Sequence, residues 1–492
     1  MRKIIYITII LMLFVAKIYG QHENTLYFMD RVPQQHYLNP ALTPDCKWWI
    51  GGLIIPVVGQ LPPPLHLDLN LPLDYNDLIY PGSGDYADSL VTFLHPSQDV
   101  NTFLDKLSKN NYTTLEYHLN YLFFGLRIKK KAFITLDVSD RMYAHVNIPK
   151  DVFSLVLTGN AIERDANLSG LSFNLNYYRE FALGFSYVLS KYSRVGVRGK
   201  FLMGVANINT AKSDIMLNTA ETVNDLSLKA NYQINTNFPI ESVSFDESGK
   251  FIEEIEFQNF DFQNFDSVKN FIVNDFALPK NYGWSVDIGL KGDWNSELSY
   301  YVSAVDIGSI KWSKNPSNFS LEGDSAFIFK GIELRSLKLD SLKFPDLNEI
   351  LEDTYLTYSQ NAYRTWLPFK IFGGLRYKLT RRISLGVLAR FEKLDKSWLN
   401  AYTGSLNFNM FRFGNMSLSY SYNNKVWNNI GWAYTIRFGA FQWYVIGENK
   451  IGSRLFPDKT RNIGFRFGCN LVFGRGGKKK GKQGDLPLLN TL

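Results

Sequence analysis

Apolar and polar residues alternate with a period of two through much of the chain, most clearly from residue 367 to residue 474. In one segment of this region, Ile383, Leu385 and Val387 fall on one face, with Ser384 and Gly386 on the other. A period of two predicts β-strands with one apolar face. Because the opposite face is rich in Gly, Ser, Asn and Arg, it suits a wet lumen better than a packed core. The pattern predicts the wall of a transmembrane β-barrel.

The same alternation recurs in three earlier hairpins, 115–138, 171–205 and 282–312, and in the segment 226–238. Short turns join the paired strands and long excursions separate the hairpins, as in outer-membrane barrels. Segments of suitable length number about 14, although 12 or 16 fits the pattern nearly as well. The predicted fold class is therefore all-β, a transmembrane antiparallel barrel of about 14 strands.

Aromatic residues gather near the ends of the last segments, where a lipid-facing band is expected to meet the headgroups. They are Trp427, Trp432, Tyr434, Phe438, Phe441, Trp443 and Tyr444.

The chain begins with the pattern of a signal peptide, in which Arg2 and Lys3 precede a short apolar run. The segment after it has no clean periodicity and contains Asn-Pro and Pro-Pro steps, which oppose helix. Trp48–Val58 is also compatible with a first strand. The predicted organisation is a signal peptide at 1–20, a hatch or plug at 21–72, an outer-membrane barrel at 73–474 and a disordered basic tail at 475–492.

Two long excursions interrupt the predicted wall, at 239–279 and 312–366. Both are acidic, and the first contains a tandem pentad, FQNFD, at 257–266. Loops of this length are usually functional or ordered by a partner, so we expect a protein partner at these two sites. Short helices are expected in the loops, at 99–110, 149–157, 267–276 and 345–355.

Composition and charge favour a membrane barrel over other classes. Aromatic residues make up 15% of the chain, and no segment after the N-terminus approaches the roughly 20 apolar residues of a membrane helix. The net charge of +7 is partly that of the tail, and no nucleic-acid signature is present, so we expect no nucleic-acid partner. Only two cysteines occur, Cys46 and Cys469, and unpaired thiols are favoured over a single bridge.

No catalytic or metal-binding signature is apparent. The six histidines show no paired metal-ligand spacing, so we expect neither a metal nor a cofactor. Glu116 and His118 lie two apart on a strand and therefore share the inner face. An acid–base pair can be written for them, but polar lumen residues of this kind are the norm in barrels. The predicted protein is not an enzyme.

Several cations have the parity of the inner face or lie at its rims. A charge facing lipid at mid-depth costs about 2–4 kcal/mol, which favours an inward orientation. Once inward they need counter-charges, which we expect from acidic residues of the N-terminal segment and of the excursions. Two roles follow, electrostatic docking of a plug or binding of an acidic or amphipathic ligand. These residues are Arg198, Lys200, Arg376, Arg382, Arg390, Arg437 and Arg466.

The motif Tyr-Leu-Asn-Pro-Ala-Leu at 37–42, together with the alternating wall, resembles the long-chain fatty-acid transporter family. That resemblance implies a fourteen-stranded barrel closed by a small hatch, with Asn39, Pro40 and Ala41 as hatch residues. Three further stretches, 24–46, 306–312 and 461–474, are similar to an uncharacterised family of Bacteroidota outer-membrane barrels related to those of type IX secretion and gliding.

The sequence therefore predicts an outer-membrane β-barrel, exported by its signal peptide. The first hypothesis is a plugged channel that binds or passes a hydrophobic or amphipathic small molecule and contacts outer-membrane lipid. The alternative is a non-transporting barrel that anchors or supports secretion or surface machinery. A secreted soluble β-rich binding protein is the third reading.

Overall fold

The computed structural model describes most of the predicted barrel and part of the N-terminal segment. The predicted signal peptide, the basic tail, the tandem pentad and the helices predicted at 267–276 and 345–355 lie outside the described residues. The described ranges are 24–55, 64–95, 97–129, 131–159, 165–219, 226–237, 240–245, 252–257, 281–323, 355–394, 397–410, 414–423, 426–448 and 461–474.

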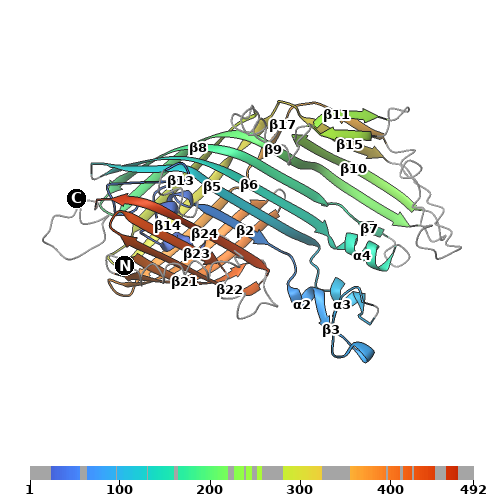
Figure 1. Ribbon diagram of the computed structural model, residues 1–492, viewed down its shortest axis with the longest axis horizontal. Coiled ribbons are helices and arrows are strands. Elements are labelled where there is room, and N and C mark those ends of the chain that lie inside the picture. Colours follow the sequence, from blue (N-terminus) through green and yellow to red (C-terminus); the bar gives the residue numbers. More distant parts are fainter. Residues whose placement is uncertain are drawn as a thin grey trace.

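The strands close into a fourteen-stranded antiparallel β-barrel, which confirms the predicted fold class (Figure 1). Twelve positions are single strands, namely β5, β6, β8, β9, β13 and β14, then β19, β20, β21, β22, β23 and β24, and the position between β14 and β19 is formed by β17 and β18. The fourteenth position is shared by two short strands, Trp48–Gly51 and Leu65–Asn70, which lie end to end between β24 and β5. These two, β1 and β2, close the cylinder.

The wall strands are β5 (Asn110–Ile128), β6 (Ala132–Pro149), β8 (Ser172–Ser190), β9 (Ser193–Thr219), β13 (Asn281–Asp293), β14 (Leu298–Trp312), β17 (Tyr363–Trp366), β18 (Lys370–Lys378), β19 (Ile383–Leu394), β20 (Ser397–Met410), β21 (Gly414–Asn423), β22 (Val426–Phe438), β23 (Phe441–Glu448) and β24 (Asn462–Phe473).

The other elements are η1 (Thr25–Phe28), η2 (Pro33–Tyr37), α2 (Tyr75–Leu78), β3 (Ile79–Pro81), η3 (Gly84–Tyr86), β4 (Leu90–Thr92), α3 (Val100–Leu104), α4 (Lys150–Thr158), β7 (Asp165–Asn167), β10 (Leu226–Asn237), β11 (Ile240–Phe245), β12 (Ile252–Phe257), β15 (Ser317–Gly323) and β16 (Tyr355–Ser359). No described helix is both long enough and apolar enough to cross a membrane.

The outer surface of the wall is apolar, as the alternation predicts. On β8 and β19, Leu183 and Val387 are more than 60% exposed, while their neighbours Gly184 and Gly386 face the lumen. Exposed aromatics form two bands, one at the end with tight turns and one toward the long loops. The first includes Tyr192, Trp294, Tyr377 and Phe438, and the second Tyr282, Trp284, Trp366 and Trp398.

Two aromatic residues point into the lumen, although the sequence pattern predicts that they face outward. Strict alternation from Leu115 would place Phe123 outside, but an extra residue on β5 between Asn120 and Leu122 reverses the alternation and buries its ring in the lumen. Tyr444 was expected in the aromatic band, but it shares the inward parity of Gln442 on β23 and is fully buried.

The register between β13 and β14 also shifts, between Val286 and Ile288. Asp306 adopts a positive φ of 63°, which lets Val305 and Asp306 both face inward. Asp tolerates this left-handed backbone better than most residues. The bulge places an extra carboxylate in the lumen.

The pairing of β14 with the next wall position is interrupted just beyond this bulge. β18 pairs with β14 as far as Val305, and β17 pairs with it again from Ser309. Pro368 lies in the gap and has no N–H to donate. By contrast, pairing is continuous through Gly373 and Gly374.

Beyond the wall, the long-loop end carries two further structures (Figure 1). The far half of β9 pairs with β10, and the sheet continues to β15 and β16, so part of the excursion predicted at 312–366 is strand. A knob formed by α2, β3, β4 and α3 packs against α4 through Phe93, Phe103 and Phe153.

Candidate functional site

The segment Asn24–Cys46, which we call the plug, lies inside the barrel. Its residues contact inward-facing side chains on nearly every side of the wall. Thr25 N–H donates to Glu448 of β23 at 2.6 Å, and His36 Nε2 lies 3.0 Å from Asp137 of β6. Because β23 and β6 lie at different positions around the barrel, only a segment within the lumen can contact both strands. Within the predicted hatch range 21–72, the plug is therefore lumenal, while β1 and β2 belong to the wall.

Asn39 and Pro40 lie directly on the wall, at a place where two glycines are paired. Gly196 of β9 and Gly289 of β13 face each other across the sheet. A Cβ at Gly289 would come 2.1 Å from Asn39 Oδ1, and one at Gly196 would come 2.2 Å from the Pro40 carbonyl carbon. The glycines leave a flat surface that admits the plug backbone.

The Asn39 side chain fastens this contact. Its Nδ2 donates to Tyr27 Oη at 3.1 Å and to the Leu290 carbonyl at 3.2 Å. Its Oδ1 accepts from the Ala41 N–H at 2.9 Å. The buried amide is therefore satisfied on both sides, which pins the turn at Asn39–Ala41 against the wall.

An apolar core of its own holds the plug in the lumen. Tyr27 stacks on Phe372 of β18, and Phe28 packs where a Cβ at Gly374 or Gly386 would crowd it. These glycines make room in the lumen. The buried cluster comprises Leu26, Tyr27, Phe28, Met29, Val32, Leu38 and Leu42 of the plug with Tyr301, Val305, Phe372, Leu388, Ala433, Tyr444 and Ile446 of the wall.

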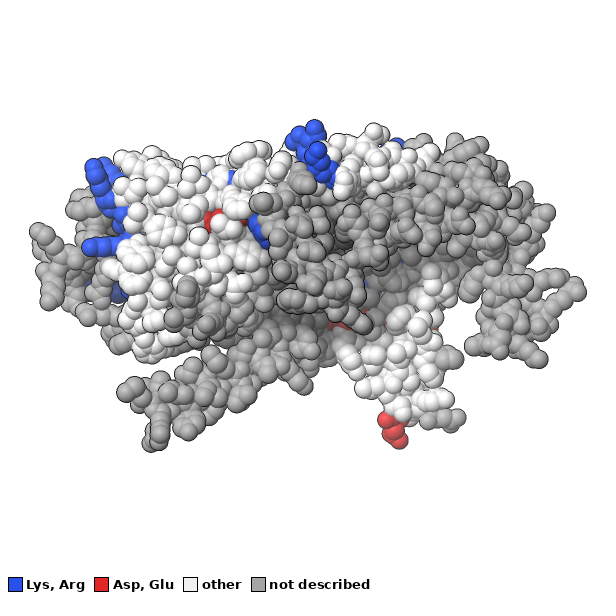
Figure 2. Space-filling view, turned by 45° about the horizontal axis from the view of Figure 1, so that its top comes forward, with Lys and Arg blue, Asp and Glu red and all other residues white. Residues whose placement is uncertain are grey.

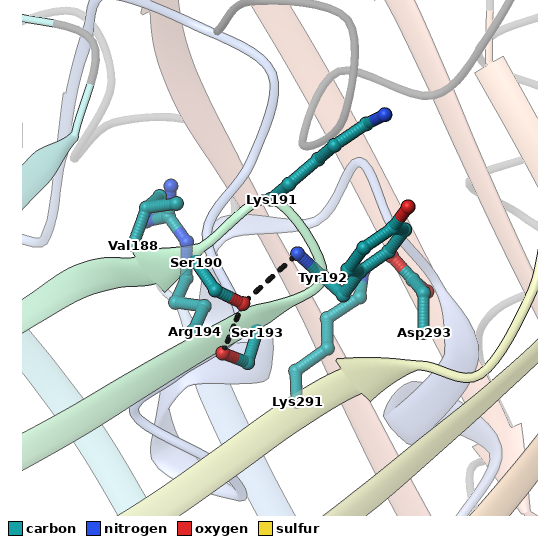
Figure 3. Close-up of a pocket in the computed structure, with 8 residues that line it drawn as sticks. All are labelled: Val188, Ser190, Lys191, Tyr192, Ser193, Arg194, Lys291 and Asp293. Carbon is teal, nitrogen blue, oxygen red and sulfur yellow. Dashed lines mark hydrogen bonds between the residues drawn. The ribbon is translucent and has the colours of Figure 1, made fainter.

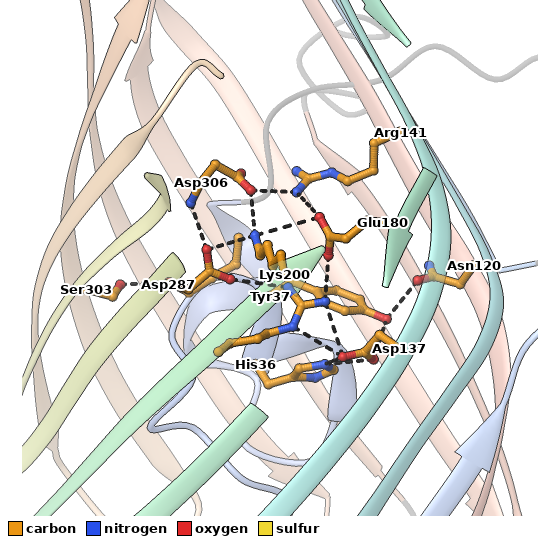
Figure 4. A network of polar contacts seen from close by, with 12 residues as sticks. His36, Tyr37, Asn120, Asp137, Arg141, Glu180, Lys200, Asp287, Ser303 and Asp306 are labelled. Atoms are coloured by element: carbon orange, nitrogen blue, oxygen red, sulfur yellow. Dashed lines mark hydrogen bonds and ion pairs between the residues drawn. The ribbon is translucent and has the colours of Figure 1, made fainter. Parts of the chain in front are cut away.

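A network of buried charges crosses half of the inner wall beside the plug (Figure 4). It draws one or two side chains from each of seven consecutive wall strands, β5 through β18. The carboxylates are Glu116, Asp137, Glu180, Asp287 and Asp306, and the cations are Arg141, Arg198, Lys200 and Lys370.

Arg198 and Lys200 stand at the centre of the network. Arg198 contacts Glu180 at 2.8 Å and both Asp137 and Asp287 at 3.2 Å. Lys200 contacts Asp287 at 2.7 Å and Asp306 at 2.5 Å. Each of these charges therefore has at least one counter-charge at contact distance, as buried ions require.

The plug is tied to this network through His36 and Tyr37. His36 lies against Asp137, and Tyr37 Oη donates to Asn120 at 2.7 Å. The Arg198 guanidinium lies over the Tyr37 ring, 5.0 Å from its centroid. Because Asp137 and Arg198 each contact both plug and wall, the plug and the network are electrostatically one unit.

A small recess that opens to solvent lies at one side of the network. Arg141 and Lys370 line it as cations, and Glu116 and Asp306 hold them in place at 2.7–3.5 Å. The rest of its lining is less polar: Met142, Tyr143, Tyr178 and Pro368. A charged floor with phenol, thioether and proline walls suits an amphipathic molecule.

The structure brings together four of the residues selected from the sequence. Glu116, Arg198 and Lys200 belong to the network, and the His118 ring lies 5.1 Å from that of Tyr37. Glu116 accepts from Lys370, so the structure gives it a different partner from the acid–base pair considered with His118.

The other selected cations are dispersed. Arg376 pairs with Asp30 of the plug, and Arg390 pairs with Glu392 of its own strand at 3.1 Å. The Arg466 guanidinium lies 5.6 Å from the centroid of the Tyr37 ring. Arg437 donates to the Val472 carbonyl near the tight-turn end, and Arg382 lies in the exposed turn after β18.

The expected source of counter-charge is right for Arg376, which pairs with Asp30 of the plug. It is wrong for Arg198 and Lys200, because the described carboxylates that face them come from the wall. Adjacent strands lie about 4.8 Å apart, closer than any excursion. The alternation of the sequence is sufficient to place Asp137 and Glu180 on the inner face. It does not place Asp306 there, because the bulge at this residue interrupts the alternation.

Within the ranges that the structure describes, no cluster of three His, Cys, Asp or Glu residues has metal-site geometry. The described Cys46 and Cys469 are unpaired and buried, as predicted.

Residues 40–447 match the model of a family described as a family of unknown function (DUF5723). The chain belongs to this family. No curated protein matches the chain significantly.

Among solved structures, the Pseudomonas putida toluene transporter TodX is 7% identical, with 90% of this chain and 93% of that one covered and a TM-score of 0.36. A Pseudomonas aeruginosa FadL homologue is 8% identical, with coverage of 90% and 94% and a TM-score of 0.38. The CymD monoaromatic hydrocarbon channel is 8% identical, with coverage of 93% and 98% and a TM-score of 0.33. At these scores the likeness carries no argument about ligand or mechanism.

Proposed function

We propose that the protein is an outer-membrane barrel whose plugged lumen binds a hydrophobic or amphipathic small molecule in the recess beside the charged network. The observation that carries this proposal is the recess itself. Its two cations, the buried Lys370 and the 15% exposed Arg141, lie on its surface, and its other walls are apolar or phenolic. A carboxylate, hydroxyl or similar head would meet Arg141 and Lys370, and an apolar tail would contact Met142 and Pro368.

Placement in the outer membrane is supported by the outer surface. A band of aliphatic side chains lies between two rows of exposed aromatics, the arrangement that lipid-facing barrels use. The long loops lie at one end and the tight turns at the other. By the general rule for such barrels, the tight turns face the periplasm.

The wall interruption offers a sideways route from the recess. Pro368 lines the recess and also lies where β14 loses its regular pairing. A stretch that lacks ladder hydrogen bonds opens at lower cost than a fully paired one. With the plug fastened beneath the network, we infer that a ligand leaves laterally more readily than straight through the barrel.

The test is to purify the full chain from outer membranes in mild detergent and analyse both bound small molecules and bound proteins. The proposal expects an extractable apolar or amphipathic compound that is depleted in a Lys370→Met variant. A matched control is Lys131→Met, an exposed lysine in a turn. Recovery of identical extracts from all three proteins, with no enriched compound, overturns the proposal.

A second function, a platform for surface or secretion machinery, is favoured by the knob and the sheet extension. The knob exposes Leu90 by 68% and Leu94 by 62%, outside the lipid-facing band. Exposed apolar side chains beyond the membrane favour a protein contact. A stable protein partner recovered without bound lipid, and lost when Leu90 and Leu94 become Ser, would support the platform instead of the channel.

A further inference from the structure

Two cations lie directly opposite each other on the inner wall near the tight turns. Arg194 of β9 and Lys291 of β13 are paired across the sheet, and both face inward. On its other side, Arg194 is paired with Val188 of β8, which is apolar. Like charges in directly opposed positions destabilise a sheet. Lys291 Nζ lies over the Tyr301 ring, 5.5 Å from its centroid, so Arg194 is the cation of this pair that needs a compensating group.

Arg194 lacks the counter-charge that Arg198, Lys200 and Arg376 have. Its side chain is only 2% exposed, and its one hydrogen bond is from Nη1 to the neutral Ser186 Oγ at 3.2 Å. Nε and Nη2 have no hydrogen-bond partner. By comparison, Arg198 and Arg376 each contact carboxylates. A buried, uncompensated guanidinium is costly unless an anion pairs with it.

The unpaired edge of Arg194 has a defined chemistry. Nε and Nη2 lie on the same side of the guanidinium and point two N–H groups in parallel. This edge matches two oxygens of a phosphate or carboxylate in a bidentate contact. The positive charge of Arg127 opposes that of Arg194, while the N–H groups of Arg127 donate to the Cys46 and Pro44 carbonyls.

Arg194 lines a small pocket that opens to solvent (Figure 3). Arg194 and Lys291 line it together with Ser190 and Ser193, whose hydroxyls lie 2.8 Å apart. Asp293 is the single carboxylate of the lining, and it accepts a hydrogen bond from Ser299. The lining is therefore net positive and offers hydroxyl donors beside the cations.

The rim around this pocket is also basic. Lys129, Lys131, Arg381 and Arg382 lie in neighbouring turns at the same end. Figure 2 shows Lys and Arg side chains gathered at its left-hand end, where Figure 1 places the C-terminus. Such a field raises the local concentration of anions at the mouth of the pocket.

We propose that this pocket, which Arg194 and Lys291 both line, binds a phosphate-type oxyanion, with Arg194 holding two of its oxygens. The anion neutralises the buried guanidinium and stabilises the β8–β9 turn. Two sources share this chemistry, a free phosphate or phosphomonoester and the headgroup of an anionic phospholipid in the adjacent leaflet.

The test uses the full chain in a maltoside detergent without phosphate. Thermal unfolding is followed while inorganic phosphate is added. The wild type should gain stability with phosphate, because a ligand bound to the folded state alone raises the midpoint. Arg194→Met should weaken the apparent phosphate affinity at least tenfold, and Lys291→Met should weaken it too. Arg381→Gln, an exposed arginine in a neighbouring turn, is the control and should respond as the wild type does.

A second measurement separates a binding role from a structural one. In phosphate-free detergent, Arg194→Met should unfold at the same temperature as the wild type or higher, because it removes an uncompensated buried charge. Lower stability of this variant without phosphate, or an equal phosphate response in the wild type and both site variants, overturns the proposal. Should Arg194→Met not fold, the Lys291→Met titration decides by the same criterion.

The two sources are distinguished by reconstitution into vesicles. Phosphatidylglycerol in a phosphatidylcholine bilayer should abolish the effect of added phosphate if the headgroup occupies the pocket, and should leave it unchanged if a free phosphate is the ligand. The Arg194→Met protein should show no phosphate effect in either bilayer. A phosphate response in that variant equal to the wild type contradicts both arms.

Discussion

At the scale of single residues, the lumen is organised by pairing of buried charge. Seven strands contribute the side chains of the network, and Arg198 alone contacts three carboxylates. Ion pairs at this depth are not strong evidence of net stabilisation, since desolvation offsets much of the attraction. Removing one member is different, because it leaves the others buried without compensation.

Arg198→Met should therefore destabilise the barrel by about 3–5 kcal/mol. The variant leaves Asp137, Glu180 and Asp287 with one cation fewer and also removes the contact over the Tyr37 ring. Denaturant unfolding in detergent measures the loss. Lys131→Met, on the exposed β5–β6 turn, is the control and should change stability by less than about 0.5 kcal/mol. A small effect of Arg198→Met contradicts the central role of this residue.

A pH dependence is expected in the knob. Burial raises the pKa of the Asp74 carboxyl above its usual range, and the neighbouring Asp77 carboxylate raises it further, against the opposing effect of Arg461. Since folding favours the protonated acid, the ionised form destabilises the folded knob at neutral pH. Lowering the pH through the raised pKa removes this cost.

Asp74→Asn should therefore protect the knob at pH 7, and its advantage should vanish below the ordinary Asp pKa of about 3.9. Hydrogen exchange of residues 74–109, compared between variant and wild type at each pH, measures the difference. Faster exchange in the variant at pH 7 would show that the attraction between Asp74 and Arg461 stabilises the folded knob more than burial of the Asp74 carboxylate destabilises it.

At the scale of elements, the plug is held by shape as much as by charge. The paired Gly196 and Gly289 create the flat site on which Asn39 and Pro40 lie, and Gly374 and Gly386 make room for Phe28. These contacts are close enough that one added methyl group has no room. The plug therefore depends on the absence of side chains on the wall.

Gly289→Ala should displace the Asn39 turn and loosen the plug. Because the added carbon would come 2.1 Å from Asn39 Oδ1, either the turn or the strand must move. We expect single-channel openings in planar bilayers to become several-fold more frequent than in the wild type. Gly199→Ala on β9 is the matched control, because a Cβ there meets no atom within 4 Å. Equal conductance in both variants contradicts docking at this site.

At the scale of the whole molecule, wall and plug are separable parts. β1 begins at Trp48, after the plug ends, and the fourteen wall positions close without any plug residue. The plug nevertheless supplies half of the apolar cluster in the lumen. The barrel can therefore close without it, at the cost of exposing apolar side chains to water.

Deletion of residues 24–46 should leave a folded barrel with a steady open conductance. The paired strands of the wall persist, but the side chains of Tyr301, Phe372 and Tyr444 become exposed to water in the lumen. The midpoint temperature of unfolding should therefore fall. Heat-modifiable migration on gels reports the barrel, and bilayer recording reports the pore. A folded but non-conducting deletion variant would show that other parts of the chain close the lumen.

The periodicity alone determined the broad architecture. A period of two is a local property of the chain, so it correctly predicted an antiparallel barrel of about 14 strands and the outward face of segments such as Ile383–Phe391. It also indicated inward-facing Arg198 and Lys200, because a charge that faces lipid is too costly. Both conclusions need only the identity of neighbouring residues.

The tertiary structure decided which charges meet and where the alternation breaks. The extra residue on β5 turned Phe123 inward, and the left-handed Asp306 added a carboxylate to the lumen. Neither bulge has a distinctive residue pattern, and one extra residue exchanges the two faces of every position after it. The partners of Arg198 lie 18 to 89 residues away in sequence. Strand order and register bring them together, since Asp287 lies directly opposite Arg198 and Glu180 is on the strand at its other side, and no local pattern encodes either.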